Sequence, residues 1–233
     1  MNDERRALDD WLASAAGTAF RQAECQAVGT ELGRLFGAYF LQVGRWGPPD
    51  AFIGMPAMAR RALCHTEAGP DVDFVGRPER LPIPKRSIDG LLLAHTVELS
   101  RYPHEVLREA ERVLKGGGRL MLLGFNPTSL FGLRRLMAGG QYPPGLAQLV
   151  TVRRLRDWLS LLGFDVTIAG RYYTALPVAH TLGEQLRRLP LTWGAYMMLA
   201  VKRVHNVRPL RSRWRAPAKV AGRLVEPSTR NPV

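Results

Sequence analysis

Residues 81–98 read LPIPKRSIDGLLLAHTVE, and residues 103–120 read PHEVLREAERVLKGGGRL. The apolar run at residues 88–95 has the length and composition of a parallel strand that is buried on both faces. Pro103 is well placed to begin a helix, and the three glycines from Gly116 are well placed to end it. Residues 119–125 then form a second apolar run. Strand, helix and strand in this order predict an α/β fold with a mostly parallel sheet.

The chain on either side of this block continues the alternation. Apolar residues at helical spacing predict two helices before any strand, the second of which ends at Gly37. Downstream, Thr151 can cap a helix that Gly163 ends. The other expected elements are strands at 39–43, 62–65, 71–75, 164–172 and 196–204, with a weaker helix at 51–62. We therefore divide the chain into N-terminal helices (residues 1–36), a sheet-containing domain (37–204) and a basic C-terminal extension (205–233).

Composition excludes several classes of protein. The chain has 233 residues, of which 46% are hydrophobic and 23% charged, so disordered, collagen-like and disulfide-scaffold proteins are ruled out. The longest apolar stretch, around Trp193 to Val201, falls short of the ~20 residues that span a bilayer. Cys25 and Cys64 are too few for a zinc site and are expected to be reduced thiols. With no secretory signal at the amino terminus, these features predict a cytoplasmic protein without a metal or a transmembrane segment.

The positive charge is concentrated at the carboxyl terminus. From Lys202 onward, nine Lys and Arg residues stand against one Glu, so the last 32 residues carry +8 and the first 201 carry +5. This asymmetry favours an attached basic segment, beginning at about Lys202, over a wholly basic nucleic-acid-binding domain.

Ligands of open α/β sheets bind beyond the carboxyl ends of the strands. The loops expected there are residues 44–49, 95–101 and 126–129. A glycine directly after the first strand, such as Gly44, lets a cofactor approach the backbone closely. A plain turn between a strand and a helix would place Gly44 and Gly47 equally well.

The two segments quoted above resemble class I S-adenosyl-L-methionine (SAM)-dependent methyltransferases, specifically the type 11 methyltransferase domain. The family pattern is LPFxxxSFDxVxxxHxLEH, followed by a helix that reads LxExxRVLKPGGxL. Residues 124–135 and 207–215 also look like a bacterial branch of that superfamily, and the resemblance extends from about residue 35 to 215. It implies a Rossmann-like fold, a seven-stranded sheet in the order 3-2-1-4-5-7-6, and SAM as co-substrate. The second strand is expected to be degenerate, because residues 67–71 are too few for a helical crossover.

The resemblance also assigns the cofactor-binding positions. The family's first motif, DxGCGxG, aligns with Gln42, Gly44, Trp46 and Gly47, so the acidic residue is Gln42 and the second glycine is Trp46. Trp46 either crowds the methionine end of the cofactor, in which case Trp46→Gly improves affinity, or packs in the core, where truncation costs roughly 3 to 5 kcal/mol. Glu67 is the candidate for the ribose. At the adenine position, Arg77 replaces an acceptor and Pro78 removes a donor.

Four polar residues near the strand ends have a structural and a functional interpretation. His95 is the candidate general base and a further cofactor contact, because its unperturbed pKa lies near neutrality, but it can equally be a structural histidine. Glu98 and Asn126 are candidate substrate contacts, and Glu98 can equally be an acid at the start of a helix. Asp89 is expected to bond backbone where its strand begins.

Two functions remain open from the sequence. One is a SAM-dependent methyltransferase with an unidentified acceptor. The other is a methyltransferase-like protein without cofactor binding that acts as an RNA- or partner-binding module, which Trp46, Arg77 and Pro78 favour. The basic extension is expected to contact RNA or another polyanion, or to be a solvated strap. Its candidate contacts are Arg208, Arg211, Arg213, Trp214 and Arg215.

Overall fold

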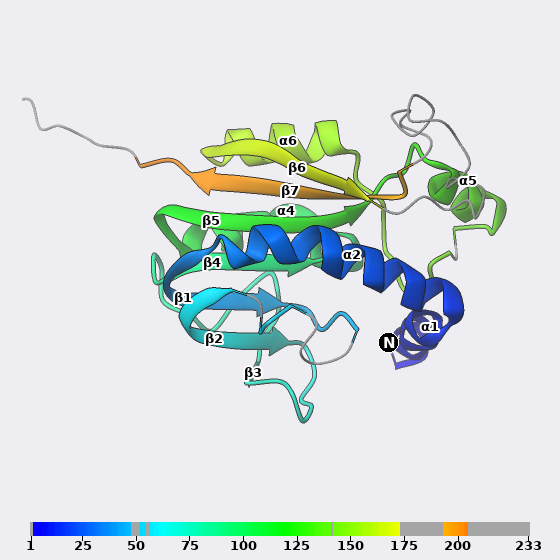
Figure 1. Ribbon diagram of the computed structural model, residues 1–233, viewed down its shortest axis with the longest axis horizontal. Helices are drawn as coiled ribbons and strands as arrows, with labels where there is room; N and C mark the ends of the chain where they lie inside the picture. The colour runs from blue at the N-terminus through cyan, green and yellow to red at the C-terminus, as the bar shows by residue number, and fades with distance from the viewer. Residues whose placement is uncertain (1, 48–51, 55, 141, 173–192, 205–233) are drawn as a thin grey trace, which may run out of the picture.

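A computed structural model describes residues 2–47, 52–54, 56–140, 142–172 and 193–204. Seven strands form one sheet in the order β3-β2-β1-β4-β5-β7-β6 (Figure 1), which confirms the predicted order. The strands are β1 (Phe36–Val43), β2 (Ala57–His65), β3 (Phe74–Val75), β4 (Ile88–Ala94), β5 (Leu114–Phe125), β6 (Phe164–Tyr172) and β7 (Ala195–Lys202). The helices are α1 (Asn2–Ala13), α2 (Ala15–Gly33), α3 (Thr96–Leu99), α4 (Pro103–Val113), α5 (Leu130–Met137) and α6 (Val152–Leu161).

The pairing of the strands gives the sheet two opposite edges. The pairs β1–β2, β1–β4, β2–β3 and β4–β5 are parallel, whereas β7 is antiparallel to both β5 and β6. We call the edge where β1, β2, β4 and β5 end the carboxyl edge. The opposite edge, where β1, β4 and β5 begin and β7 ends, is the amino edge. In Figure 1 the carboxyl edge lies on the right and the amino edge on the left.

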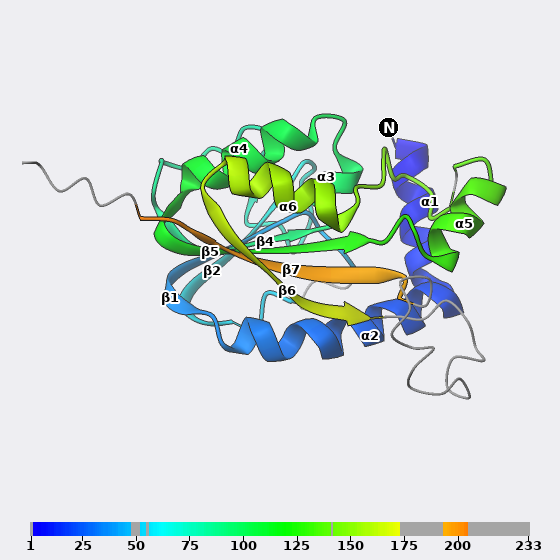
Figure 2. The same cartoon turned by 90° about the horizontal axis from the view of Figure 1, so that it is seen from above.

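Helices cover both faces of the sheet. Figure 2 shows α3, α4 and α6 on one face and α2 on the other, with α1 and α5 beyond the carboxyl edge. On the first face, the apolar stripe of α4 packs against Leu155 and Leu159 of α6 and the strands between them. On the second face, Phe20, Val28 and Leu32 of α2 pack against alternate residues of β1, β4 and β5. Burial on both faces explains why these strands read as continuous apolar runs.

Local signals explain where several helices begin. Ser14, Ser129 and Thr151 occupy the N-cap positions of α2, α5 and α6, and each side chain accepts a hydrogen bond from a backbone N–H in the first turn. Pro103 begins α4, as predicted. The predicted end of α4 is wrong, because the helix stops at Val113 and the glycines from Gly116 lie within β5.

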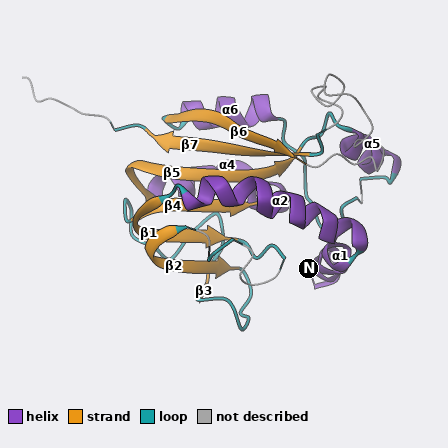
Figure 3. Cartoon of the chain, viewed as in Figure 1, coloured by secondary structure: helices purple, strands orange, loops and turns teal. Residues whose placement is uncertain are grey.

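The region around β2 differs from the prediction in its details. The expected helix at 51–62 is wrong, because β2 occupies residues 57–65 beside β1. Similarly, α2 ends at Gly33 and β1 begins at Phe36, so Gly37 belongs to the strand. Residues 66–73, between β2 and β3, contain no helix, as expected from their number (Figure 3). Pairing with the buried strand β1 outweighs the helical spacing of this segment, since tertiary contacts override weak local preferences.

The carboxyl end of the described chain is part of the sheet. Lys202 is 8% exposed and donates to the backbone oxygens of Glu111 and Leu114. The backbone N–H of Arg203 donates to Gly163 O. The prediction that the basic segment begins at about Lys202 is therefore wrong, and its arginines from Arg208 onward lie outside the described residues. Among the described helices, none is long and apolar enough to cross a membrane.

Candidate active site at the carboxyl edge

The turn after β1 is built on two glycines with positive φ. Gly44 has φ +92° and Gly47 has φ +78°, a region that favours glycine. A Cβ on Gly44 would lie 2.9 Å from Thr96 Oγ1, and a Cβ on Gly47 would lie 2.8 Å from Arg21 Cδ. The turn is therefore pressed between the start of α3 and the side chain of Arg21 on α2, and it tolerates no larger residue at either position.

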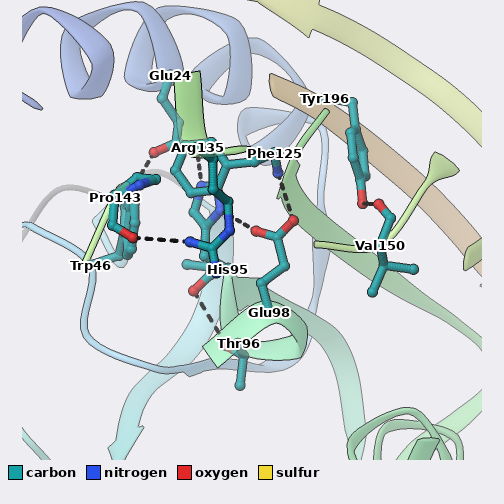
Figure 4. A network of polar contacts seen from close by, with 11 residues as sticks. Glu24, Trp46, His95, Thr96, Glu98, Phe125, Arg135, Pro143, Val150 and Tyr196 are labelled. Carbon is teal, nitrogen blue, oxygen red and sulfur yellow. Dashed lines mark hydrogen bonds and ion pairs between the residues drawn. The ribbon is translucent and has the colours of Figure 1, made fainter. Parts of the chain in front are cut away.

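Trp46 packs in the core. Its side chain is 1% exposed, and its indole N–H donates to Glu24 Oε2 at 2.6 Å (Figure 4). The indole centroid lies 4.1 Å from that of the His95 ring and 6.1 Å from that of Phe125. The structure therefore favours the second of the two predicted alternatives for Trp46.

His95 lies between two carboxylates. It follows β4 with φ +54°, and its side chain is fully buried. Its Nε2 lies 2.9 Å from Glu24 Oε1, and its Nδ1 lies 3.0 Å from Glu98 Oε2. Burial by itself would lower the pKa of His95, but the charges and hydrogen bonds of both glutamates outweigh burial and raise that pKa to about 9. The imidazole is therefore a buried cation at neutral pH.

This arrangement contradicts the predicted general-base role of His95. A general base needs a ring nitrogen that can accept a proton from a substrate, and here both ring nitrogens hold carboxylates. Protonation at neutral pH removes the remaining basicity. His95 instead joins α2 to the end of β4, since Glu24 comes from α2.

The two predicted substrate contacts are also engaged within the protein. Glu98 is fully buried, and its Oε1 accepts the backbone N–H of Phe125 at 2.8 Å, which joins α3 to β5. Burial raises the pKa of Glu98, although its contacts with His95 oppose this shift. Asn126 is 2% exposed, and its Oδ1 accepts hydrogen bonds from the backbone N–H and the hydroxyl of Thr128. Both side chains hold loops in place and do not face a substrate.

The residues expected at the ribose and adenine positions lie further along the carboxyl edge. Glu67 follows β2 and is exposed. Arg77 and Pro78 follow β3, with Arg77 exposed and Pro78 half-buried. Arg77 forms an isolated bridge with Arg80, which closes a short turn of backbone. The structure thus places these residues beside the strand ends without building a buried pocket from them.

Two residues of α2 were missed from the sequence. Glu24 binds both Trp46 and His95, and Arg21 lies against Gly47. A signal for Glu24 was present, because the buried residues Phe20, Glu24 and Val28 are spaced by four on one helix face. A carboxylate within an apolar stripe needs a buried partner, and that partner can only be found in three dimensions.

Two buried polar atoms at this turn make no hydrogen bond. Gln42 donates from Nε2 to Gly44 O at 3.1 Å, but its Oε1 has no partner. Arg21 donates from Nη2 to Thr18 at 3.4 Å, but its Nε has no partner. Unsatisfied buried groups are rare, so an acceptor and a cationic donor of this kind mark a place for a polar ligand.

Comparisons with known proteins agree with this architecture. A family model described as a methyltransferase domain matches residues 48–122. The uncharacterized protein YafS of Escherichia coli is 35% identical over 169 residues, which cover 72% of this chain and 69% of YafS.

Solved structures show the same fold. A SAM-dependent methyltransferase from Thermotoga maritima superposes with a TM-score of 0.58 at 19% identity, covering 78% of this chain and 89% of that one. A SAM-dependent methyltransferase from Archaeoglobus fulgidus gives a TM-score of 0.55 at 20% identity, covering 76% and 94% of the two chains. The chain therefore belongs to the class I methyltransferases with a type 11 methyltransferase domain, in the branch that includes YafS.

Proposed function

We propose that this protein is a SAM-dependent methyltransferase that binds the methionyl end of SAM at the turn after β1. The observation that carries the proposal is the pair of unsatisfied buried atoms, Gln42 Oε1 and Arg21 Nε, on either side of Gly44 and Gly47. An amino-acid group carries one carboxylate and one ammonium. The Arg21 guanidinium can pair with the carboxylate, and the Gln42 carbonyl oxygen can accept the ammonium.

The residues present fit the two ends of SAM unequally. At the adenine position, Arg77 offers no acceptor for an exocyclic amine, and Pro78 has no backbone N–H to donate. Glu67 remains the carboxylate nearest the end of β2 for the ribose hydroxyls. We therefore expect the methionyl contacts to dominate affinity, and binding to be weak.

The chain contributes position more than proton transfer. When bound, SAM supplies an activated methyl group for in-line displacement. Because His95 and Glu98 bind each other, neither is available to deprotonate the acceptor. The buried network of Glu24, His95 and Glu98 instead fixes the turn against α2 and β5. This favours an acceptor that is already nucleophilic at neutral pH. The two free thiols, Cys25 and Cys64, suit a reducing cytoplasm, where we place the protein.

One observation favours a second candidate. Trp46, Glu24 and His95 fill the interior directly beyond the ends of β1 and β4, and all three side chains are buried. If they leave no room for SAM, the protein is a methyltransferase-like binding module that has lost the cofactor.

Calorimetric titration with SAM and S-adenosylhomocysteine separates the two. We expect wild-type protein to bind S-adenosylhomocysteine weakly and Arg21→Gln to lose about ten- to a hundredfold in affinity, the usual range for a hydrogen bond to a charged group. Arg156→Gln, an exposed arginine on α6, is the matched control and should bind as wild type does. Absence of heat at millimolar ligand in all three proteins would establish the binding-module alternative.

A further inference from the structure

The amino edge exposes two aromatic side chains. Phe36 is 71% exposed and Tyr39 is 41% exposed, both on the first half of β1. Residues 36–39 are all exposed, in contrast to residues 40–43, which are all buried. Large aromatic groups on a surface are informative because their burial would be favourable, so a partner is indicated.

Each exposed ring lies beside a cation. The Arg119 guanidinium lies 4.9 Å from the centroid of Phe36. Arg60, which is opposite Tyr39 in the β1–β2 register, lies 5.8 Å from the Tyr39 centroid, and Lys115 Nζ lies 5.6 Å from it. We call Phe36, Tyr39, Arg60, Lys115 and Arg119 the edge cluster.

Few carboxylates balance these cations. Asp89 pairs with Lys115 at 2.7 Å and accepts the backbone N–H groups of Ala38 and Tyr39. This confirms its predicted structural role and holds the start of β1 in place. Within the described part of the chain, neither Arg60 nor Arg119 pairs with a carboxylate. The edge cluster therefore carries net positive charge beside exposed rings.

The basic extension leaves the sheet at the same edge. In the β5–β7 register, Arg119 lies opposite Val201, three residues before the last described residue, Val204. A Cβ on Gly116 of β5 would lie 3.4 Å from the Val204 side chain. The following residues, 205–233, contain seven Lys and Arg residues and one Glu. A segment of that charge would be repelled by the edge cluster, so the partner of the cluster is an anion from outside the chain.

We propose that the amino edge is a binding surface for single-stranded nucleic acid. Arg60, Lys115 and Arg119 would contact phosphates, and bases would stack on Phe36 and Tyr39. This combination of a cationic track and aromatic platforms binds single strands without sequence preference.

The orientation of the two rings favours a single strand over a membrane. Side chains alternate along a strand, so Phe36 lies on the face of Phe40 and Tyr39 on the face of Leu41. Phe40 packs with α2 and Leu41 with α4, on opposite faces of the sheet. A flexible strand can cross the edge and touch both rings, whereas a flat bilayer meets only one face.

The surface is separate from the carboxyl edge. The eight residues of β1 span about 25 Å at ~3.3 Å per residue. A strand held at the amino edge is therefore tethered to the protein and does not lie in the site proposed for SAM. The inference stands or falls independently of the cofactor.

Fluorescence anisotropy with a labelled 20-nucleotide oligo(U) tests the proposal on full-length protein. Phe36→Ala with Tyr39→Ala should weaken binding about tenfold at constant salt, because base stacking is lost. Arg60→Gln with Arg119→Gln should lower the slope of log affinity against log salt by about 1.4, at ~0.7 per phosphate contact. The matched control is Arg108→Gln with Arg154→Gln, which removes two exposed arginines from α4 and α6. Melting curves confirm that all variants are folded.

Three outcomes would overturn the proposal. The first is unchanged affinity in both edge variants. The second is an equal loss in the control, which would show that net charge alone is responsible. The third is tighter binding to vesicles containing phosphatidylserine than to oligo(U), lost in the edge variants, which would make the edge a lipid-binding surface. Equal effects with oligo(dT) would support single-stranded binding without preference for ribose.

Discussion

The two edges of the sheet treat the same chemical groups in opposite ways. At the carboxyl edge, a tryptophan, a histidine and two glutamates are buried and bound to one another. At the amino edge, aromatic and cationic side chains are exposed and contact each other only loosely. Buried polar groups are costly unless every atom has a partner, so the first set is fixed by folding. The second set is inexpensive to keep exposed, which leaves it available for a partner.

The largest test of this contrast compares one aromatic residue from each edge. Trp46→Ala should reduce the free energy of unfolding by about 3 to 5 kcal/mol, because it leaves a cavity and removes the donor to Glu24. Phe36→Ala, at a side chain that is 71% exposed, should change it by no more than about 0.5 kcal/mol. Urea denaturation measures both. A stable Trp46→Ala protein that binds S-adenosylhomocysteine more tightly than wild type would show that the indole occupies cofactor space.

The pH dependence of stability should report the buried carboxyl edge. The pKa of His95 is raised from 6.5 to about 9 in the folded protein, so the native state binds its proton more tightly than the unfolded state does. This stabilisation is complete below about pH 6.5 and is lost as the pH rises toward 9, amounting to about 3 kcal/mol. The raised pKa of Glu98 acts in the same direction.

Urea denaturation at several pH values from 6 to 9.5 measures this loss. His95→Gln is the matched variant, and its stability should vary much less over the same interval. If wild type and variant lose stability in parallel, the titrating group lies elsewhere in the chain.

Cofactor affinity should be more sensitive to the carboxyl edge than to the amino edge. Arg77→Asp restores an acceptor at the expected adenine position and should tighten S-adenosylhomocysteine binding about tenfold, corresponding to one added hydrogen bond of about 1.4 kcal/mol. Arg60→Asp introduces the same charge change at the amino edge and should have no such effect. Equal tightening in both variants would attribute the gain to general electrostatics.

The smallest effect concerns the basic extension. Replacement of Arg208, Arg211, Arg213 and Arg215 by glutamine should lower the salt slope for oligo(U) by about 0.7 for each arginine that contacts a phosphate. Affinity at low salt should fall only modestly if the edge cluster supplies the stacking contacts. An unchanged slope would leave the extension as a solvated strap and confine nucleic-acid contacts to the edge.

Much of the fold could be predicted from local pattern. The apolar runs of β4 and β5, the helix opened by Pro103 and the cap at Thr151 each depend on neighbouring residues. The family resemblance supplied the strand order, which the structure confirms. The segment before β2 was predicted incorrectly, because its strand is specified by pairing with β1 and not by its own spacing.

The candidate site could be located but not interpreted. Parallel strands place their carboxyl ends at one edge, so the sequence by itself identified the turns after β1 and β4. It also determined that Gly44 and Gly47 must be small. Only the tertiary structure decided what His95 does, because Glu24 is 71 residues away in the chain and reaches His95 through the packing of α2. The same holds at the amino edge, where Phe36 and Arg119 meet across the sheet. Charge and protonation depend on distance in space, and one-dimensional spacing contains that distance only within a single helix or strand.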